Sequence, residues 1–172
     1  MTLGYVLSEN PGETDRLLSM FASLHQMAET AVVGVVQSNV TCKDANGCDM
    51  DALVLPDGPT IRISQSLGKN ARGCRLDPAA LEQAVSEVQK RLLPETELLI
   101  VNKFGKHEAD GRGFRELIAH AICNAVPVLT AVNQQNLKAF LEFSGDCAVE
   151  LQPNGQALLE WFDGQAVPAQ TV

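Results

Sequence analysis

Short apolar runs alternate with segments of helical periodicity along most of this chain, and this alternation restricts the fold more than any other feature. Three of the runs, AVVGVVQ, ELLIV and PVLTAV, stand at residues 31–37, 97–101 and 127–132. Strands that are apolar on both faces are typical of parallel sheets, because helices cover both sides of such a sheet. The sequence therefore predicts an α/β fold with a mostly parallel sheet and helices on both faces.

The expected helices lie between these strands. A first strand is expected at residues 3–7, and the helix after it should bury one face. That face carries Leu17, Leu18, Phe21 and Leu24. Asp77-Pro78 marks the start of another helix, because aspartate caps free backbone amides and proline has no amide to leave unpaired. The remaining expected elements are helices at 114–123 and 136–143 and a last strand at 147–151.

Residues 39–75 interrupt this alternation. Pro56-Asp57-Gly58-Pro59 stands between two β-rich runs, and such a cluster is typical of a turn. The segment therefore predicts a β-hairpin inserted around residues 50–67. A length of 172 residues suits one domain, which we expect to span residues 1–164 and to be followed by a mobile tail at 165–172.

Composition argues against several classes of partner. No stretch approaches 18 consecutive apolar residues, and residues 1–10 lack the basic segment and the cleavage site of a signal peptide. The net charge of −8 argues against binding to nucleic acid or to an anionic membrane. We therefore expect a cytoplasmic protein with neither partner.

The five cysteines are odd in number and too sparse for a disulfide framework. Free thiols are the simpler interpretation, and they agree with a reducing compartment. Cys42, Cys48 and Cys74 leave a metal site open as an alternative, although their spacing lacks the C-x2-C pair of zinc sites. We therefore predict no metal site, and the sequence assigns no role to these three residues.

Positive charge gathers in two short segments of an otherwise acidic chain. The segments are 62–75 and 103–115, and they hold eight of the thirteen basic residues: Arg62, Lys69, Arg72, Arg75, Lys103, Lys106, Arg112 and Arg115. If the two segments meet in space, they form a local anion site. Two unrelated solvated loops are the other interpretation.

The segment LSENPGETDRLL, residues 7–18, has the strand, turn and helix layout of a phosphate-binding loop. A functional loop reads G-x-x-x-x-G-K-[ST], in which the lysine neutralises phosphates and the hydroxyl binds magnesium. Aligning Gly12 and Thr14 with the last glycine and threonine puts Glu13 at the lysine. A carboxylate about 4 Å from a phosphate charge costs about 4 kcal/mol at an effective dielectric constant near 20. The segment therefore occupies the position of a phosphate-binding loop, but it cannot bind phosphate in the usual way unless Glu13 points outward.

A second candidate segment, NKFGKHEADGRG, follows the ELLIV strand. Ligands of such sheets bind at the carboxyl ends of the strands, so residues 8–16, 102–112 and 131–135 should share one rim. Asn102 and Lys103 stand where a triphosphatase has the acid that orders magnesium. An amide and an ammonium discourage a divalent metal and favour an anion.

Two neighbouring residues could transfer protons. Glu108 is the nearest carboxylate and could act as a displaced acid or base, and the imidazole of His107 could take part in proton transfer. A solvated loop position of no special role is the simpler interpretation for each of them.

The segments VNKFGKHEADGRGFRE, PVLTAV and ISQSLGKNARGCRLDP closely resemble a little-characterised bacterial domain family of unknown function, itself similar to small P-loop nucleoside triphosphatases. The likeness covers roughly residues 3–151 and implies their three-layer fold. In the related active triphosphatases the corresponding strand ends in an Asp-Glu pair, followed by a glycine and a glutamate. Here Asn102-Lys103 replaces the pair, whereas Gly105 and Glu108 keep the flanking pattern. The resemblance therefore implies the fold without implying hydrolysis.

Three functions remain open. The first is an anion-binding protein, whose ligand is a small oxyanion (phosphate, sulfate or molybdate) or the phosphates of a nucleotide. Its expected ligand-binding residues are Glu13, Thr14, Arg72, Arg75, Asn102, Lys103, Lys106, His107 and Arg112. The second is a divergent magnesium-dependent triphosphatase or phosphotransferase, with Lys103 and Glu108 as catalytic residues. The third is a homo-oligomeric regulatory protein whose basic rim binds an acidic partner.

Overall fold

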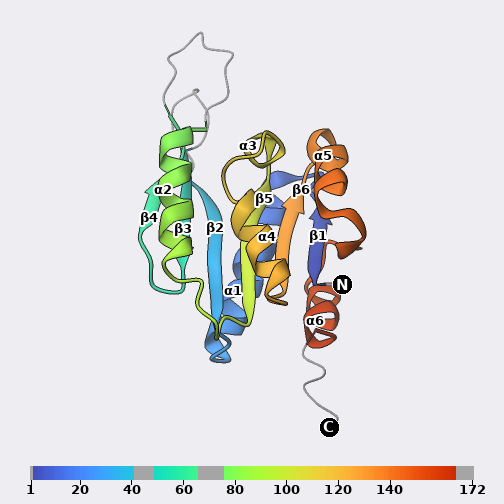
Figure 1. Ribbon diagram of the computed structural model, residues 1–172. Helices are drawn as coiled ribbons and strands as arrows, with labels where there is room; N and C mark the ends of the chain where they lie inside the picture. The colour runs from blue at the N-terminus through green and yellow to red at the C-terminus, as the bar shows by residue number, and fades with distance from the viewer. Residues whose placement is uncertain (1, 41–48, 66–75, 166–172) are drawn as a thin grey trace.

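The computed structural model describes residues 2–40, 49–65 and 76–165, and within these ranges seven strands form one sheet of order β4-β3-β2-β5-β6-β1-β7 (Figure 1). The strands are β1 (Leu3–Leu7), β2 (Val32–Val40), β3 (Asp49–Leu55), β4 (Thr60–Arg62), β5 (Leu98–Phe104), β6 (Val128–Val132) and β7 (Ala148–Leu151). The helices are α1 (Pro11–Met27), α2 (Pro78–Gln89), α3 (Lys106–Ala109), α4 (Arg115–Cys123), α5 (Gln134–Ser144) and α6 (Gly155–Asp163), with a 3-10 turn η1 (Gly145–Cys147).

The sheet is parallel except at one edge. Strands β2, β5, β6, β1 and β7 run parallel, whereas β3 pairs antiparallel with β2 and β4 pairs antiparallel with β3. The antiparallel strands are the hairpin expected around residues 50–67, with its turn at residues 56–59. The predicted fold class, a mostly parallel sheet with an inserted hairpin, is therefore confirmed.

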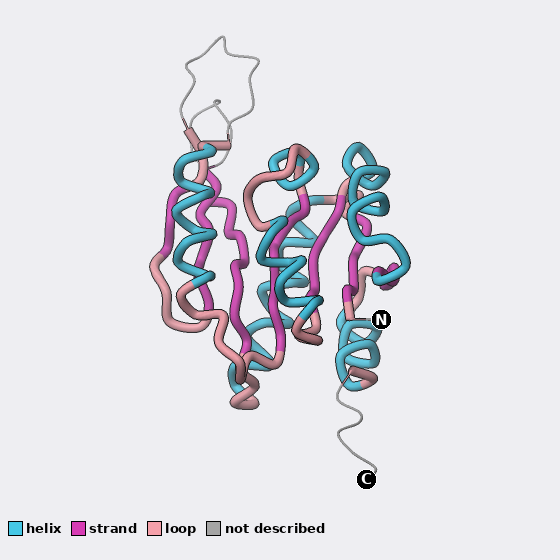
Figure 2. The backbone as a smooth tube through the Cα atoms, in the orientation of Figure 1, coloured by secondary structure: helices cyan, strands magenta, loops and turns pink. Residues whose placement is uncertain are grey.

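Helices cover both faces of the sheet (Figure 2). On one face, α1 and α6 bury Leu18, Phe21, Leu158 and Trp161 against the strands. On the other face, α2, α4 and α5 pack on a second apolar cluster that contains Val35, Val101, Leu117 and Phe140. Successive side chains of the central strands therefore point alternately into the two apolar clusters, which explains why the sequences of these strands are continuously apolar.

Strands β2 and β5 approach each other very closely at Gly34. This residue has φ +134°, and a Cβ atom added to it would lie 1.9 Å from the carbonyl oxygen of Ile100, its partner in β5. That φ value also disfavours any residue with a side chain. The junction between β2 and β5 therefore requires glycine at position 34.

The start of α2 follows its prediction, because the Asp77 carboxylate accepts hydrogen bonds from the amides of Ala79 and Ala80 and Pro78 occupies the first turn. Three other details differ. Leu24 was expected on the buried face of α1, yet it is 50% exposed. Helix α6 was not predicted at all, and α3 lies where the sequence predicted a loop.

Strand β5 extends to Phe104, so Asn102 and Lys103 lie within the strand and not after it. Among the helices that the structure describes, none combines the length and the apolar character needed to cross a membrane. The tail expected at 165–172 lies outside the described residues beyond Gln165, as do residues 66 and 67 of the expected hairpin.

Candidate functional site

The junction between β1 and α1 is short and closed. Only residues 8–10 separate the strand from the helix, and Pro11 brings no amide hydrogen to the first turn. The amides of Glu13 and Thr14 both donate to the carbonyl oxygen of Asn10, at 3.0 and 3.2 Å. The buried Thr14 hydroxyl donates to the buried Ser8 hydroxyl at 3.1 Å. The groups that would bind phosphate and magnesium in a functional loop therefore bond within the junction itself.

Glu13, which takes the place of the lysine, is exposed and accepts a hydrogen bond from the Asn10 side chain at 3.2 Å. Its carboxylate thus points outward, as the sequence left open.

A pocket of about 810 Å³ lies at the carboxyl ends of the strands, on the face that α2 and α4 cover. Six of the predicted site residues line it: Asn102, Lys103, Lys106, His107, Glu108 and Arg112. Glu13 and Thr14 are not among its lining residues, although their neighbour Asp15 is. Arg72 and Arg75, like Cys42, Cys48 and Cys74, lie outside the described residues. The structure therefore brings Lys103, Lys106 and Arg112 of the second basic segment to the pocket and says nothing about the predicted arginines of the first.

Asn102 joins three elements at the wall of this pocket. Its side-chain NH2 group donates to the carboxylate of Asp15 in α1 at 2.9 Å, and its side-chain oxygen accepts from the amide of Gln37 in β2 at 3.0 Å. The Asn102 side chain is buried. A neutral amide suits this place, because an aspartate here would oppose the Asp15 carboxylate at hydrogen-bond distance.

Glu108 was expected in solvent, but it is only 3% exposed. One carboxylate oxygen accepts from the amide of Gly105 at 2.9 Å and the other from the amide of Phe114 at 3.2 Å. Burial raises the pKa of Glu108, and these hydrogen bonds partly offset that rise. The carboxylate therefore closes the segment between β5 and α4 by satisfying buried backbone donors at both of its ends.

Gly113 makes this closure possible. It has φ +59°, and a Cβ atom added to it would lie 2.3 Å from a carboxylate oxygen of Glu108. A residue with a side chain would displace the carboxylate from its backbone donors.

His107 is likewise buried, not exposed as the sequence suggested. Its Nε2 atom lies 3.3 Å from a carboxylate oxygen of Glu82 in α2, and that oxygen also accepts from the amide of Gly113. His107 lines both the pocket described above and a second cavity of about 1080 Å³ between α2 and α4. Its ring therefore forms part of the wall that the two cavities share.

The cations of the site differ in their partners. Neither Lys103 nor Lys106 forms an ion pair or side-chain hydrogen bond with any residue that the structure describes, whereas Arg112 lies 3.7 Å from the Asp110 carboxylate. Arg115, expected in the same basic segment, packs over the Phe143 ring at 4.3 Å and donates to the Glu108 carbonyl oxygen. Arg62 pairs with carboxylates of β3 on the exposed hairpin.

No cluster of three or more His, Cys, Asp or Glu residues that could hold a metal ion occurs within residues 2–40, 49–65 and 76–165. The predicted rim segment 8–16 contains Asp15, but the sequence named neither Asp15 nor Gln37 as a site residue. A helix position and a strand position carry no motif, and only the topology brings them to the rim. The third predicted rim segment, 131–135, also reaches the pocket, where Asn133 lines it from the junction between β6 and α5 and Gln135 lines it from the first turn of α5.

A model of the family described as "Protein of unknown function (DUF2478)" matches residues 3–161. The chain belongs to this family. The resemblance seen in the sequence is thereby confirmed, and the family itself carries no assigned activity.

Two further proteins share this fold or sequence. The molybdenum import ATP-binding protein ModC 2 of Bradyrhizobium diazoefficiens is 36% identical over 159 residues, which make up 91% of this chain and 18% of that protein. This chain therefore spans less than a fifth of that relative's length. The crystal structure of THEP1 from the hyperthermophile Aquifex aeolicus matches with a TM-score of 0.63 at 12% identity over 94% of each chain. The fold is thus the α/β fold of P-loop nucleoside triphosphatases.

Proposed function

We propose that this protein binds a small anion in the pocket beside β5 and does not hydrolyse nucleoside triphosphates efficiently. The observation that carries the proposal is the availability of two cationic side chains at the pocket. Among the described residues, the lining carboxylates of Asp15, Glu108 and Asp110 each have a hydrogen-bond or ion-pair partner, whereas the ammonium groups of Lys103 and Lys106 have none. Two unpaired positive charges at a concave site favour an anionic ligand.

The state of the β1 junction supports the absence of efficient hydrolysis. Its short loop, the outward Glu13 and the Thr14 hydroxyl bonded to Ser8 leave no counterpart of the usual lysine and magnesium ligand. In β5, Asn102 holds Asp15 and Gln37 where an acid would order magnesium.

The class of anion is supported by the relative's name. Tetrahedral oxyanions such as phosphate, sulfate and molybdate all suit ammonium groups, and a protein named as a molybdenum import ATP-binding protein contains a segment similar to this chain. Nucleotide phosphates are the other source of the same chemistry. Consistent with the net charge of −8, we also propose that the protein binds neither nucleic acid nor a membrane. We further propose a cytoplasmic location and a homo-oligomer, which light scattering can test.

Isothermal titration calorimetry with phosphate, sulfate, molybdate and ATP, each with and without magnesium, tests the proposal. At least one anion should bind to the wild type, and Lys103→Gln combined with Lys106→Gln should weaken it tenfold or more, equivalent to about 1.4 kcal/mol. Lys138→Gln is the matched control, because Lys138 is exposed on α5 and does not line the pocket. Binding that is absent, or unchanged in the double variant, contradicts the proposal.

A divergent magnesium-dependent triphosphatase is the second candidate, favoured by the fold and by the ATP-binding relative. It predicts magnesium-dependent release of phosphate from ATP or GTP that falls strongly in Lys103→Ala. Because Glu108 is engaged by two backbone amides, it would have to leave its position to act as an acid or base. Turnover that survives purification and disappears in that variant would replace the first proposal with this one.

A further inference from the structure

Helix α1 carries an apolar stripe on its outer side, away from the sheet. Among the described residues, six large apolar side chains are exposed, and three of them lie on α1, whereas β3, the α2–β5 connection and α5 carry one each. The three on α1 are Met20, Leu24 and Met27, which are 72%, 50% and 84% exposed. Their spacing of four and three residues places them on one face of the helix. The stripe is therefore one continuous surface.

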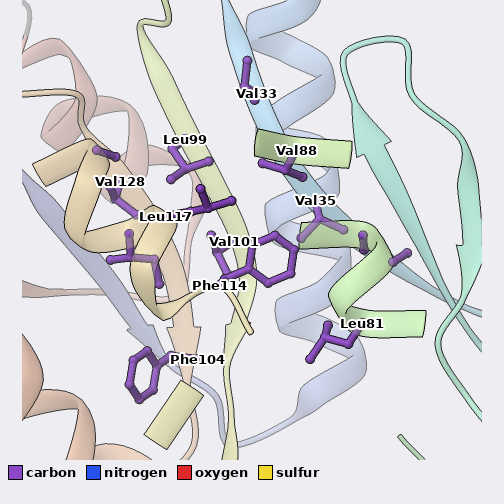
Figure 3. Close-up of a cluster of buried hydrophobic side chains, with 14 of the residues drawn as sticks. Val33, Val35, Leu81, Val88, Leu99, Val101, Phe104, Phe114, Leu117 and Val128 are labelled. Carbon is purple, nitrogen blue, oxygen red and sulfur yellow. The ribbon is translucent and has the colours of Figure 1, made fainter. Parts of the chain in front are cut away.

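Helices α2 and α4 place their apolar side chains differently. Leu81 and Val88 of α2 and Leu117 of α4 lie against the strands (Figure 3), and all three are buried. Helix α1 buries Leu18 and Phe21 against the sheet in the same way, and it presents further apolar side chains outward. A helix that is apolar on two sides is typical of one with a packing partner on each side. The sheet covers only one side of α1.

Phe162 of α6 widens the exposed apolar surface. Its ring centroid lies 4.7 Å from that of His25 and 6.3 Å from that of Phe21, and the Phe162 side chain is only partly buried. His25 and Phe21 are neighbours of Leu24, one along the chain and the other along the helix face. The surface therefore extends from the stripe toward α6.

Opposite charges stand at the two ends of the stripe. Arg16 lies one turn before Met20, and Glu29 lies two residues after Met27. Both charged side chains are exposed, and neither forms an ion pair or side-chain hydrogen bond with any residue that the structure describes. Helices that lie on membranes carry many basic residues on their polar face, whereas residues 11–29 contain one arginine and three carboxylates. The surface therefore suits a protein partner and not a membrane.

This arrangement is complementary to itself. When two α1 helices pack antiparallel about a two-fold axis with Met20 of each copy opposite Met27 of the other, Leu24 lies near the axis. Arg16 of each copy then stands within two positions of Glu29 of the other, about 3 Å along the helix axis. A parallel arrangement would instead place like charges together at both ends. The two ends of the stripe therefore favour a second, antiparallel copy of the same helix.

We propose that this face of α1 is the interface of a homodimer, in which two copies pack their α1 helices antiparallel about a two-fold axis. This inference rests on the homo-oligomer proposed above and assigns its surface. Met20, Leu24 and Met27 do not line the pocket beside β5, so the dimer leaves the proposed anion site open.

Sedimentation velocity over a range of protein concentrations measures the dissociation constant of this dimer. Met20→Glu combined with Met27→Glu should raise that constant at least tenfold, because carboxylates enter the apolar surface from both copies. Leu141→Glu is the matched control, since Leu141 is an apolar residue of α5 that is 43% exposed and lies outside the stripe. The control should leave the dissociation constant unchanged. Far-UV circular dichroism checks that each variant is folded.

Exchanging the charges tests the direction of the two helices. Arg16→Glu and Glu29→Arg should each raise the dissociation constant about threefold or more, because like charges then meet at both ends of the interface. The two changes combined restore opposite charges, so the dissociation constant should return close to the wild-type value.

The outcomes separate this interface from the other proposals. A wild-type protein that stays monomeric at every concentration would overturn both the interface and the proposed homo-oligomer, and it would leave the anion site to its own titration. A dimer that the two glutamates do not weaken would overturn the α1 interface alone. Failure of the combined charge exchange to restore the affinity would overturn the antiparallel arrangement.

Discussion

Two junctions at the same rim of the sheet have opposite characters. The β1 junction, residues 8–14, bonds its own groups to one another, whereas the β5 junction, residues 102–114, leaves Lys103 and Lys106 without partners among the described residues. In a P-loop fold the first junction usually holds the phosphates. Here the same fold places two ammonium groups at β5, which β6 separates from β1 in the sheet. The comparison teaches that two junctions of one rim can differ in the polar groups that they leave available while the fold stays the same.

The largest expected effect comes from the residue that shapes the β5 junction. Glu108→Ala leaves the buried amides of Gly105 and Phe114 without acceptors, so it should lower the free energy of unfolding by about 3 kcal/mol. Urea denaturation measures this loss. Glu116→Ala, an exposed carboxylate change on α4, is the control and should stay within about 0.5 kcal/mol of the wild type. An equal, small effect of both variants would mean that Glu108 does not close the junction.

A substitution of Asn102, which links the β5 junction to Asp15 beside the β1 junction, should have the next largest effect on stability. Asn102→Asp sets a second carboxylate against Asp15, which should cost about 2 kcal/mol at neutral pH. Because the pair would bind a proton more tightly when folded, the loss should shrink as pH falls. Urea denaturation at several pH values checks this, with the exposed Gln83→Glu as the matched control. A pH-independent loss would contradict the like-charge explanation.

Introducing the missing lysine at position 13 should change stability and ATP affinity only slightly. Glu13→Lys changes an exposed residue beside a loop that remains short and bonded to itself, so stability should stay within about 0.5 kcal/mol. ATP affinity should rise less than threefold and hydrolysis should not appear, as measured by calorimetry and phosphate release. A large gain in either would show that the β1 junction needs only its lysine.

The smallest effect concerns the titration of Glu108. Burial raises its pKa, so the folded protein binds this proton more tightly than the unfolded chain. Its stabilising contribution is therefore present below the unfolded pKa of about 4.3 and is lost as pH rises through the folded value. A carboxyl NMR titration should show the raised pKa, and Glu108→Gln should remove this part of the pH dependence. A pKa at or below the unfolded value would contradict the burial argument.

The fold was readable from the sequence because periodicity and capping reflect local chemistry. The apolar runs of β2, β5 and β6 and the Asp77 cap all follow from residues near in sequence. Helix α6 was missed because its apolar pattern is short. Its helical face becomes evident only in the folded protein, where Leu158 and Trp161 belong to the same apolar cluster as residues of α1. Leu24 was misjudged because periodicity gives a face and not its width.

The site was less readable, for a different reason. The basic segment at 103–112 could be predicted, since like charges stand close in sequence at a strand end. The burial of His107 and Glu108 could not, because their partners, Glu82 and the amide of Phe114, reach them only after the loop folds back.

Gly34 has a consequence for how this protein can vary. The pairing of β2 with β5 joins the half of the sheet that contains the hairpin to the other half. At Gly34 the backbones of these two strands come so close that no side chain fits between them. A saturation mutagenesis survey should therefore find one position in β2 that accepts no alternative residue, flanked by valines that accept other branched side chains. Such an intolerant position would reflect the packing of two backbones and not a role in binding or catalysis.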